Sequence, residues 1–212
     1  MIIEVKNLTK KFKNVVVVDN VNITFKSGKI YGIIGRNGSG KSVFLKMLCS
    51  FYLPTSGTIL QDNVDYIKNN SFPKNTRALI DGPDFIPELT GFENLKLLAS
   101  IQNKINDDKI IESLKKVNLY NDKDKKYCEY SLGMKQKLGI AQAIMENPKL
   151  LILDEAFNGI EESSVNDLKK MLKDMKNENK IIIITSHIKD DIKELADETY
   201  MFESGKLEKT DV

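Results

Sequence analysis

The segment GRNGSGKS, residues 35–42, constrains the fold of this 212-residue chain more than any other feature. It fits the pattern G-x-x-x-x-G-K-S/T, in which the glycines let backbone N–H groups turn inward around phosphate oxygens. A strand-like apolar run at residues 29–34 precedes the segment, and a helical pattern from residue 41 to about residue 50 follows it. A glycine-rich loop between a strand and a helix predicts an α/β fold that binds a nucleotide.

The residue types in this loop predict individual roles. Lys41 can reach the β- and γ-phosphates, and Ser42 can ligate Mg²⁺. The alternative, a glycine-rich turn with a surface lysine, leaves the glycines and the Lys-Ser pair unexplained. The nucleotide-binding residues expected in this segment are Gly35, Arg36, Asn37, Gly38, Ser39, Gly40, Lys41, Ser42 and Val43.

The sequence pattern changes near residue 85, from short strand-like runs to helical periodicity. Short β-branched runs predict strands at residues 2–5, 15–18, 21–25, 58–60 and 78–80. Between about residues 85 and 130 the strand signals are weak. Residues 91–101 and 107–117 have helical periodicity there, with Leu95, Leu98 and Ile101 on one face. This middle segment therefore resembles a helical insertion.

The last third returns to α/β alternation. Strands are expected at residues 150–153, 180–185 and 199–202, with helices at residues 162–175 and 189–196. Strands that alternate with helices predict a mainly parallel sheet with crossover helices.

Two carboxylates follow the apolar strand at residues 150–153. Strand ends in an open α/β sheet face the ligand crevice. We expect Asp154 to hold Mg²⁺ through water, and Glu155 to polarise the attacking water. The alternative, a pair of solvated acids at a strand end, is weakened by the phosphate loop in the same chain.

His187 is the single histidine, and it follows the apolar strand at residues 180–185. It should emerge at the same sheet edge, where it can hydrogen-bond the γ-phosphate and hold the catalytic geometry. A lone histidine is more often structural or solvent-facing, so its position alone does not decide between these roles.

A second anion-binding pattern lies at residues 130–140, YSLGMKQKLGI. Ser131 stands where a helix should begin, and Gly133 lies just inside it. Free N–H groups and the helix dipole suit an anion at such a terminus. The apolar face of this helix is expected to contain Met134, Leu138, Ala141 and Met145.

Composition limits the partners. The 32 Lys and Arg and 30 Asp and Glu are mixed along the chain, so no nucleic-acid partner is expected. Cys49 and Cys128 match no metal spacing and indicate a reducing compartment. The start, MIIEVKNLTKKF, lacks the apolar stretch of a signal peptide. No apolar run approaches the roughly 20 residues of a membrane helix, so a role at a membrane needs another polypeptide.

The order of these motifs resembles the ATPase subunits of ATP-binding cassette (ABC) transporters over essentially the whole chain. It is most similar to the short bacitracin and lantibiotic type, which serves export of, or immunity to, antimicrobial peptides. GRNGSGKS resembles the Walker A loop and LLILDE resembles Walker B. Residues 158–161 stand at the D-loop, with Asn158, Gly159 and Glu161, and His187 stands at the switch histidine. The signature position holds Ser131, Leu132, Gly133 and Met134.

The resemblance implies a P-loop NTPase fold, forming one ABC ATPase domain over residues 1–212. The fold would have a mainly parallel central sheet, an N-terminal antiparallel β subdomain and an inserted α-helical subdomain. The catalytic core would comprise residues 1–84 and 132–212, and the helical subdomain residues 85–131.

In the family, two ATPase domains face each other head to tail, and each ATP lies between one Walker A loop and the opposite signature. The Ser131 hydroxyl and the Gly133 N–H would then grip the γ-phosphate of the partner's ATP. A homodimer is the simpler expectation, and a heterodimer with a second ATPase subunit stays open. The resemblance also implies an integral-membrane permease that holds the chain, itself cytoplasmic, at the inner face of the membrane.

The chain departs from the family pattern at several positions. Leu132 replaces a signature glycine, Met134 stands where glutamine is usual, and Glu161 stands at the D-loop aspartate. Asp81 falls at the Q-loop glutamine, where a carboxylate can face Mg²⁺, although an Asp before Gly-Pro also forms turns. Hydrolysis is expected to be intact, because Lys41, Asp154, Glu155 and His187 are present.

Two further residues are assigned to nucleotide binding by resemblance. Phe12 falls at the adenine-stacking aromatic, and stacking needs only a π-face; ordinary core packing of Phe12 is the alternative. Val18 is placed beside the nucleotide as well.

The permease contact and the function have open alternatives. Phe85, Ile86, Leu89 and Phe92 are candidates for the permease contact, but they could equally pack the helical core. The main functional expectation is an ATPase that powers a separate permease. The alternatives are a non-transport ABC ATPase acting on a macromolecule, a P-loop kinase or GTPase, and a subunit that binds ATP without turnover.

Overall fold

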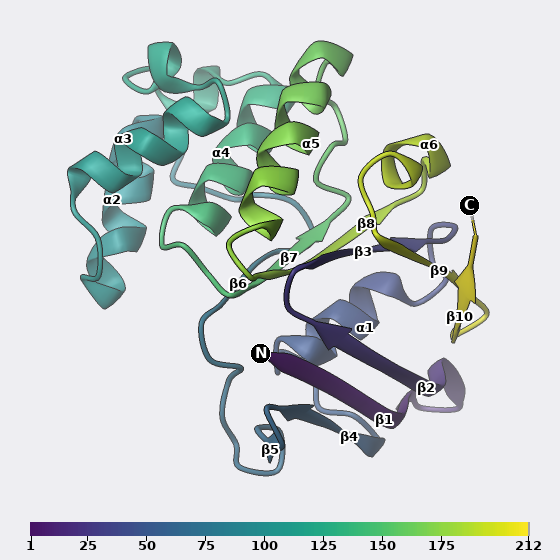
Figure 1. Ribbon diagram of the computed structural model, residues 1–212. Helices are drawn as coiled ribbons and strands as arrows, with labels where there is room; N and C mark the ends of the chain where they lie inside the picture. The colour runs from purple at the N-terminus through teal and green to yellow at the C-terminus, as the bar shows by residue number, and fades with distance from the viewer. Residues whose placement is uncertain (212) are drawn as a thin grey trace.

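A six-stranded sheet forms the centre of the computed structural model, which describes residues 1–211 (Figure 1). Its strand order is β10-β9-β3-β8-β7-β6, and all neighbours pair in parallel except β10, which is antiparallel to β9. This confirms the mainly parallel sheet. The strands are β3 (Lys29–Ile34), β6 (Thr76–Leu79), β7 (Leu150–Asp154), β8 (Ile181–Ser186), β9 (Glu198–Glu203) and β10 (Lys206–Thr210).

A second sheet is antiparallel, with the order β2-β1-β4-β5. Its strands are β1 (Ile2–Phe12), β2 (Val15–Lys26), β4 (Ser56–Gln61) and β5 (Val64–Asp65). The two runs predicted at residues 15–18 and 21–25 belong to one strand, β2. Register shifts in the β1–β2 pairing let β2 continue past Asn20, whose φ is +49°.

Helix α1 (Lys41–Leu48) lies between the two sheets (Figure 1). Its Phe44, Leu45, Met47 and Leu48 are fully buried among side chains of both sheets. Because side chains alternate along a strand, the central strands present one set of residues to α1 and the other set to the opposite face.

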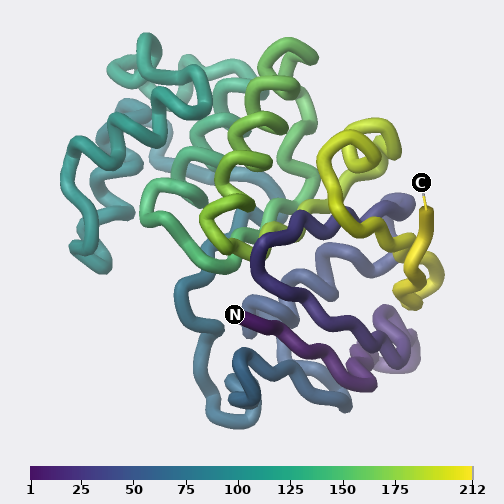
Figure 2. Tube along the Cα trace, viewed as in Figure 1, coloured from purple at the N-terminus to yellow at the C-terminus, as the bar shows by residue number. Residues whose placement is uncertain are grey.

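The opposite face of the six-stranded sheet is covered by helices (Figure 2). Helices α4 (Leu132–Ile144), α5 (Glu162–Lys176) and α6 (Lys189–Lys193) contact its strands. Helices α2 (Gly91–Gln102) and α3 (Asp107–Lys116) pack on α4. Two 3-10 turns, Tyr120–Asp122 and Tyr127–Glu129, lead from α3 to α4. The domain boundaries expected at residues 84–85 and 131–132 stay a prediction.

Helix α2 corrects one sequence expectation. Leu95 is fully buried and Leu98 is partly buried, but Ile101 is 75% exposed. Ile101 lies in the last turn of α2, whose C-cap, Asn103, is left-handed. Leu95, Leu98 and Ile101 do belong to one helix, as their spacing predicts. The buried face nevertheless ends before Ile101, because other parts of the chain pack only against the earlier turns.

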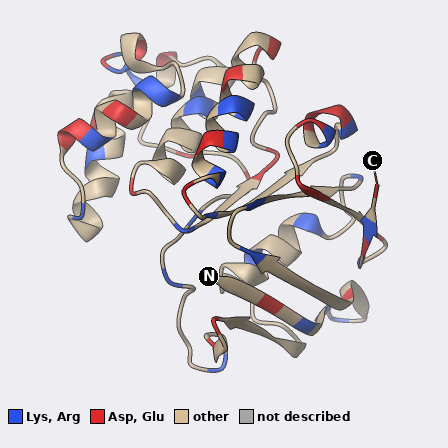
Figure 3. Cartoon of the chain, in the orientation of Figure 1, with Lys and Arg blue, Asp and Glu red and all other residues tan. Residues whose placement is uncertain are grey.

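Lys and Arg residues and Asp and Glu residues are interspersed over the helices and strands (Figure 3). Among residues 1–211, no helix combines the length and the apolar character needed to cross a membrane.

Strand register brings the motif residues together at one sheet edge. Ile34 of β3 pairs with Ser186 of β8, and Asp154 of β7 pairs with Thr185. The phosphate loop, the Glu155 position and His187 therefore leave the sheet side by side, at the carboxyl ends of parallel strands.

Candidate nucleotide site

The phosphate loop requires glycine at positions where the chain packs closely. A Cβ on Gly35 would lie 2.3 Å from the carbonyl oxygen of Phe202. A Cβ on Gly40 would lie 2.5 Å from the carbonyl oxygen of Val17, and the φ of Gly40, +113°, also disfavours a side chain. Within the described residues 1–211, the Ser39 hydroxyl oxygen is buried without a hydrogen-bond partner. A buried unpartnered hydroxyl in a glycine cradle fits a loop that binds an oxygen-rich ligand.

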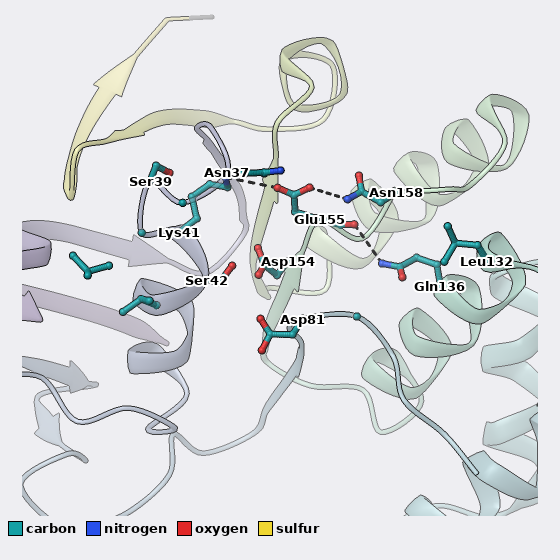
Figure 4. Close-up of a pocket in the computed structure, with 15 residues that line it drawn as sticks. Asn37, Ser39, Lys41, Ser42, Asp81, Leu132, Gln136, Asp154, Glu155 and Asn158 are labelled. Atoms are coloured by element: carbon teal, nitrogen blue, oxygen red, sulfur yellow. Dashed lines mark hydrogen bonds and ion pairs between the residues drawn. The ribbon is translucent and has the colours of Figure 1, made fainter. Parts of the chain in front are cut away.

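Lys41 is held inside this loop. It is 5% exposed, and its Nζ donates to the carbonyl oxygens of Gly35 at 2.6 Å and Arg36 at 3.1 Å. The same Nζ lies 3.7 Å from Oε1 of Glu155. The ammonium group is thus placed between the loop carbonyls and the carboxylate that follows β7 (Figure 4).

Glu155 accepts hydrogen bonds on its other carboxylate oxygen. Nδ2 of Asn158 donates to Oε2 at 2.8 Å, and Nδ1 of His187 lies 2.8 Å from the same oxygen. Burial raises the pKa of Glu155, but the hydrogen bonds from Asn158 and His187 and the charge of Lys41 outweigh it, so its pKa lies below the ordinary value. Glu155 is therefore ionised at neutral pH and able to accept a proton.

The residues expected to hold a metal ion lie around the same pocket. Asp154 is buried and accepts a hydrogen bond from the Thr185 hydroxyl, and Ser42 lines the pocket with it. Among residues 1–211, no cluster of three or more His, Cys, Asp or Glu side chains could hold a metal by itself. This donor set suits Mg²⁺, which takes one or two protein oxygens together with water and phosphate.

Asp81 also lines the pocket, but its carboxylate is ion-paired with Nζ of Lys46 on α1. The hydrogen bond to Asp81 raises the pKa of Lys46. The φ of Asp81 is +63°, a turn conformation that Asp tolerates better than most residues. Asp81 thus both forms a turn and lies beside the residues expected to hold the metal. Its ion pair with Lys46 was not expected from the sequence.

The signature segment begins α4, as predicted. Ser131 is the N-cap, and its Oγ accepts a hydrogen bond from the N–H of Met134 at 3.3 Å. A Cβ on Gly133 would lie 2.7 Å from the carbonyl oxygen of Gly159, and Leu132 packs over Gly159. The signature therefore contacts the D-loop of its own chain.

The D-loop residues have different surroundings. Asn158 turns toward Glu155, and Gly159 adopts φ +73° beneath Leu132. Glu161 is exposed at the N-cap of α5 and, in the part of the chain that the structure describes, makes no side-chain cap hydrogen bond. The segment thus connects the Glu155 carboxylate to the start of α4.

One predicted nucleotide contact is wrong. Val18 is fully buried in the core between the sheets, and the pocket is lined by its neighbour Val17. The reason is strand alternation, which turns adjacent side chains of β2 to opposite faces. A one-residue error in position therefore exchanges a core residue for a pocket residue.

Two other predicted contacts lie at the rim. Phe12 is 41% exposed, which contradicts core packing, and its ring meets Tyr52 edge-on at 5.7 Å between centroids. Arg36 is exposed and lines a separate hollow, on the His187 side of the loop. The remaining loop residues from Asn37 to Val43 line the main pocket.

Sequence reasoning missed Gln136 and Thr185. Gln136 is buried and lines the pocket, with its Nε2 3.3 Å from the carbonyl oxygen of Glu155. The Thr185 hydroxyl accepts from the N–H of Glu155 at 3.0 Å. The only sequence features that could have indicated them are their positions, Gln136 in the helix that follows the signature and Thr185 at the end of an apolar strand.

This fold and site define an α/β P-loop nucleotide-binding protein. The phosphate loop, the acidic strand end and the histidine converge at one edge of a parallel sheet.

The chain belongs to the ABC transporter family, whose sequence profile matches residues 18–158. It is 43% identical to the uncharacterized ABC transporter ATP-binding protein YybJ of Bacillus subtilis, over 97% of this chain and 94% of YybJ. It is 38% identical to the bacitracin transport ATP-binding protein BcrA of Enterococcus faecalis, over 97% of this chain and 68% of BcrA. Identity to the lantibiotic transport ATP-binding protein SrtF of Streptococcus pyogenes is 32%, over 97% and 88% of the two chains.

Solved structures share the fold. The dimeric ATP-binding cassette MJ0796, in a post-hydrolysis state with ADP and Pi, superposes with a TM-score of 0.87 at 22% identity, over 99% of both chains. The ATP-binding subunit of another ABC transporter gives a TM-score of 0.88 at 23% identity, over 100% of this chain and 90% of that one. The chain is an ATP-binding ATPase subunit of an ABC transporter.

Proposed function

We propose that this chain works as a dimer that hydrolyses Mg-ATP to power a separate permease for a peptide antibiotic. The observation that carries the proposal is the placement of the Glu155 carboxylate, with Lys41 at one oxygen and His187 and Asn158 at the other. An ionised carboxylate at the edge of a phosphate-binding pocket suits activation of water for attack on a γ-phosphate.

Each residue has a role in this proposal. Lys41 and the loop N–H groups hold the phosphates, and the glycines of the loop allow the close approach. Glu155 orients the attacking water and accepts its proton, while His187 and Asn158 hold the carboxylate in place. Ser42 and Asp154 would hold Mg²⁺, with Asp81 beside them. The bound ion would neutralise phosphate charge.

The dimer explains the second anion-binding terminus. Ser131 is exposed at the start of α4, where the first N–H groups of the helix have no intrahelical acceptor. Contact with a phosphate of the partner's ATP would use those groups and make the nucleotide part of the interface. Nucleotide favours the closed dimer only to the extent that it binds that state better than the open one.

A groove between the sheet edge and the helices is the proposed permease contact. Phe51 and Phe72, 60% and 67% exposed, line it together with Gln102 and Lys104. Of the four contacts expected from the sequence, only Ile86 is exposed, and Phe85, Leu89 and Phe92 are partly buried. A permease bound in this groove would hold the chain at the inner face of the membrane. The peptide antibiotic substrate is proposed from the names of BcrA and SrtF alone.

The test combines turnover with capture of the dimer. Wild-type chain should show phosphate release per protomer that rises with protein concentration, because one protomer holds only half of each site. Glu155→Gln should lower turnover by at least about 100-fold and elute as a dimer with saturating Mg-ATP. A Glu155→Gln chain that stays monomeric would refute the shared site. The proposed permease partner is tested by asking whether the chain copurifies with a protein that has several apolar membrane spans. Failure to copurify with such a protein would favour a non-transport ATPase.

A further inference from the structure

Gln136 reaches the backbone of Glu155 from the signature helix. Its side chain is 5% exposed, and its Nε2 donates to the Glu155 carbonyl oxygen at 3.3 Å (Figure 4). Gln136 also lines the pocket that contains Lys41 and Asp154. A buried amide with its donor on this one backbone oxygen is placed to influence the position of Glu155.

The backbone of Glu155 needs such support. Its φ is +50°, a left-handed conformation that is uncommon for a side chain of this size. Such conformations are strained and persist where the surroundings over-determine them. The N–H of Glu155 donates to the Thr185 hydroxyl at 3.0 Å. Side chains from β8 and α4 thus hold the peptide groups on both sides of the strained residue.

Helix α4 connects Gln136 to Ser131, the residue proposed to contact the partner's nucleotide. Ser131 caps the helix, and Gln136 follows five residues later in the same continuous helix. The first turn of α4 also lies against Gly159 of the D-loop. A shift of α4 would therefore move the Gln136 amide relative to the Glu155 carbonyl.

We infer that Gln136 is a positioning residue for Glu155. It holds the Glu155 backbone in its left-handed conformation and couples the helix that contacts the partner's nucleotide to the water-activating carboxylate of its own site. This inference rests on the proposed function, because it assumes that Glu155 activates water and that Ser131 contacts the opposite ATP.

The first test replaces the amide by a side chain of similar length without a donor. Gln136→Met should lower kcat about tenfold, the effect of one lost hydrogen bond to a buried group, with KM for ATP unchanged. Lys137→Met, on the same helix but with its Nζ donating to Ser164 of α5, is the matched control and should keep wild-type kcat. Gln136→His, which retains an N–H donor, should recover part of the loss. Equal kcat for the two Met variants would overturn the inference.

The second test separates positioning from damage to α4. In the Glu155→Gln background, Gln136→Met should still give the ATP-bound dimer, as measured by size-exclusion chromatography. Loss of that dimer would show that Gln136 acts on folding or on the Ser131 contact rather than on Glu155. Failure of wild-type chain to hydrolyse ATP would refute the proposed function, whereas normal wild-type turnover with unaffected Gln136→Met would refute this inference alone.

Discussion

Nδ1 of His187 lies 2.8 Å from Oε2 of Glu155, joining the ends of β8 and β7. The sequence led us to expect His187 beside the γ-phosphate, but in this structure its ring is directed to the carboxylate. Asn158 donates to the same oxygen, and Lys41 approaches the other. The carboxylate therefore has one oxygen held by two donors and one oxygen directed toward the phosphate loop.

Removing one of these donors should change the pH dependence of turnover. The pKa of Glu155 is depressed, so its active carboxylate form is present above that pKa and is lost as pH falls through it. Asn158→Ala removes a hydrogen bond that lowers the pKa, so the acid limb of the kcat–pH profile should move to higher pH. Asn121→Ala, in the 3-10 turn Tyr120–Asp122, should leave the profile unchanged. An unshifted acid limb in Asn158→Ala would show that Glu155 does not govern it.

Ser131 should have two separable roles, in capping α4 and in contacting the partner's nucleotide. Ser131→Ala should destabilise the chain by about 1 kcal/mol, as expected for loss of an N-cap, and should weaken the ATP-bound dimer. Ser131→Asp keeps a capping side chain but brings negative charge toward a phosphate, so thermal stability should be retained and dimer formation lost. The matched change Asn106→Asp, at the N-cap of α3, should affect neither. Dimer formation by Ser131→Asp at the wild-type ATP concentration would contradict the shared site.

The Lys46–Asp81 pair predicts an interaction between two substitutions. Lys46→Met should leave Asp81 as an uncompensated carboxylate beside the phosphates and weaken Mg-ATP binding about tenfold, the effect of about 1.4 kcal/mol. Asp81→Asn in the Lys46→Met background should restore most of the affinity, measured with a fluorescent ATP analogue with and without Mg²⁺. An equal loss from Lys46→Met in both backgrounds would mean that Lys46 acts on the nucleotide independently of Asp81.

Glu198 should make stability depend on acid pH. It bonds Lys29 of β3 at 2.5 Å and Lys209 of β10 at 3.0 Å, and these hydrogen bonds, that from Lys29 first, lower its pKa from 4.5 to about 2. Because the pKa of Glu198 is depressed in the folded chain, its ionised carboxylate stabilises the fold above pH 4.5, and this stabilisation is lost as pH falls toward 2.

The matched variants are Glu198→Gln and Glu203→Gln, on the same strand. At pH 7 Glu198→Gln should lower Tm by about 2–4 °C, the shift for about 1 kcal/mol in a chain of this size, with less effect at high salt. Its difference from wild type should shrink as pH falls below 4.5, whereas exposed Glu203→Gln should match wild type throughout. A constant difference across this pH range would exclude the ion pairs as its source.

Local motifs predicted most of the fold class and the centre of the site. The glycine loop, the apolar strand ending in Asp154 and Glu155, and the capped helix after Ser131 are each encoded by neighbouring residues. Their backbone geometry follows from glycine freedom, hydrophobic alternation and helix capping, which act over a few residues. The central strands and the main helices accordingly lie within a few residues of their predicted bounds.

Tertiary structure decided which distant side chains meet. The orientation of β2 decides that Val17, and not Val18, lines the pocket. The Lys46–Asp81 and Gln136–Glu155 contacts depend on how α1 and α4 pack beside the strand ends. The sequence alone determined a phosphate-binding α/β cassette with its loop, acids and histidine in order. Only the folded structure determined how Glu155 is held, because long-range packing and register bring Lys41, Gln136 and His187 to it from three separate parts of the chain.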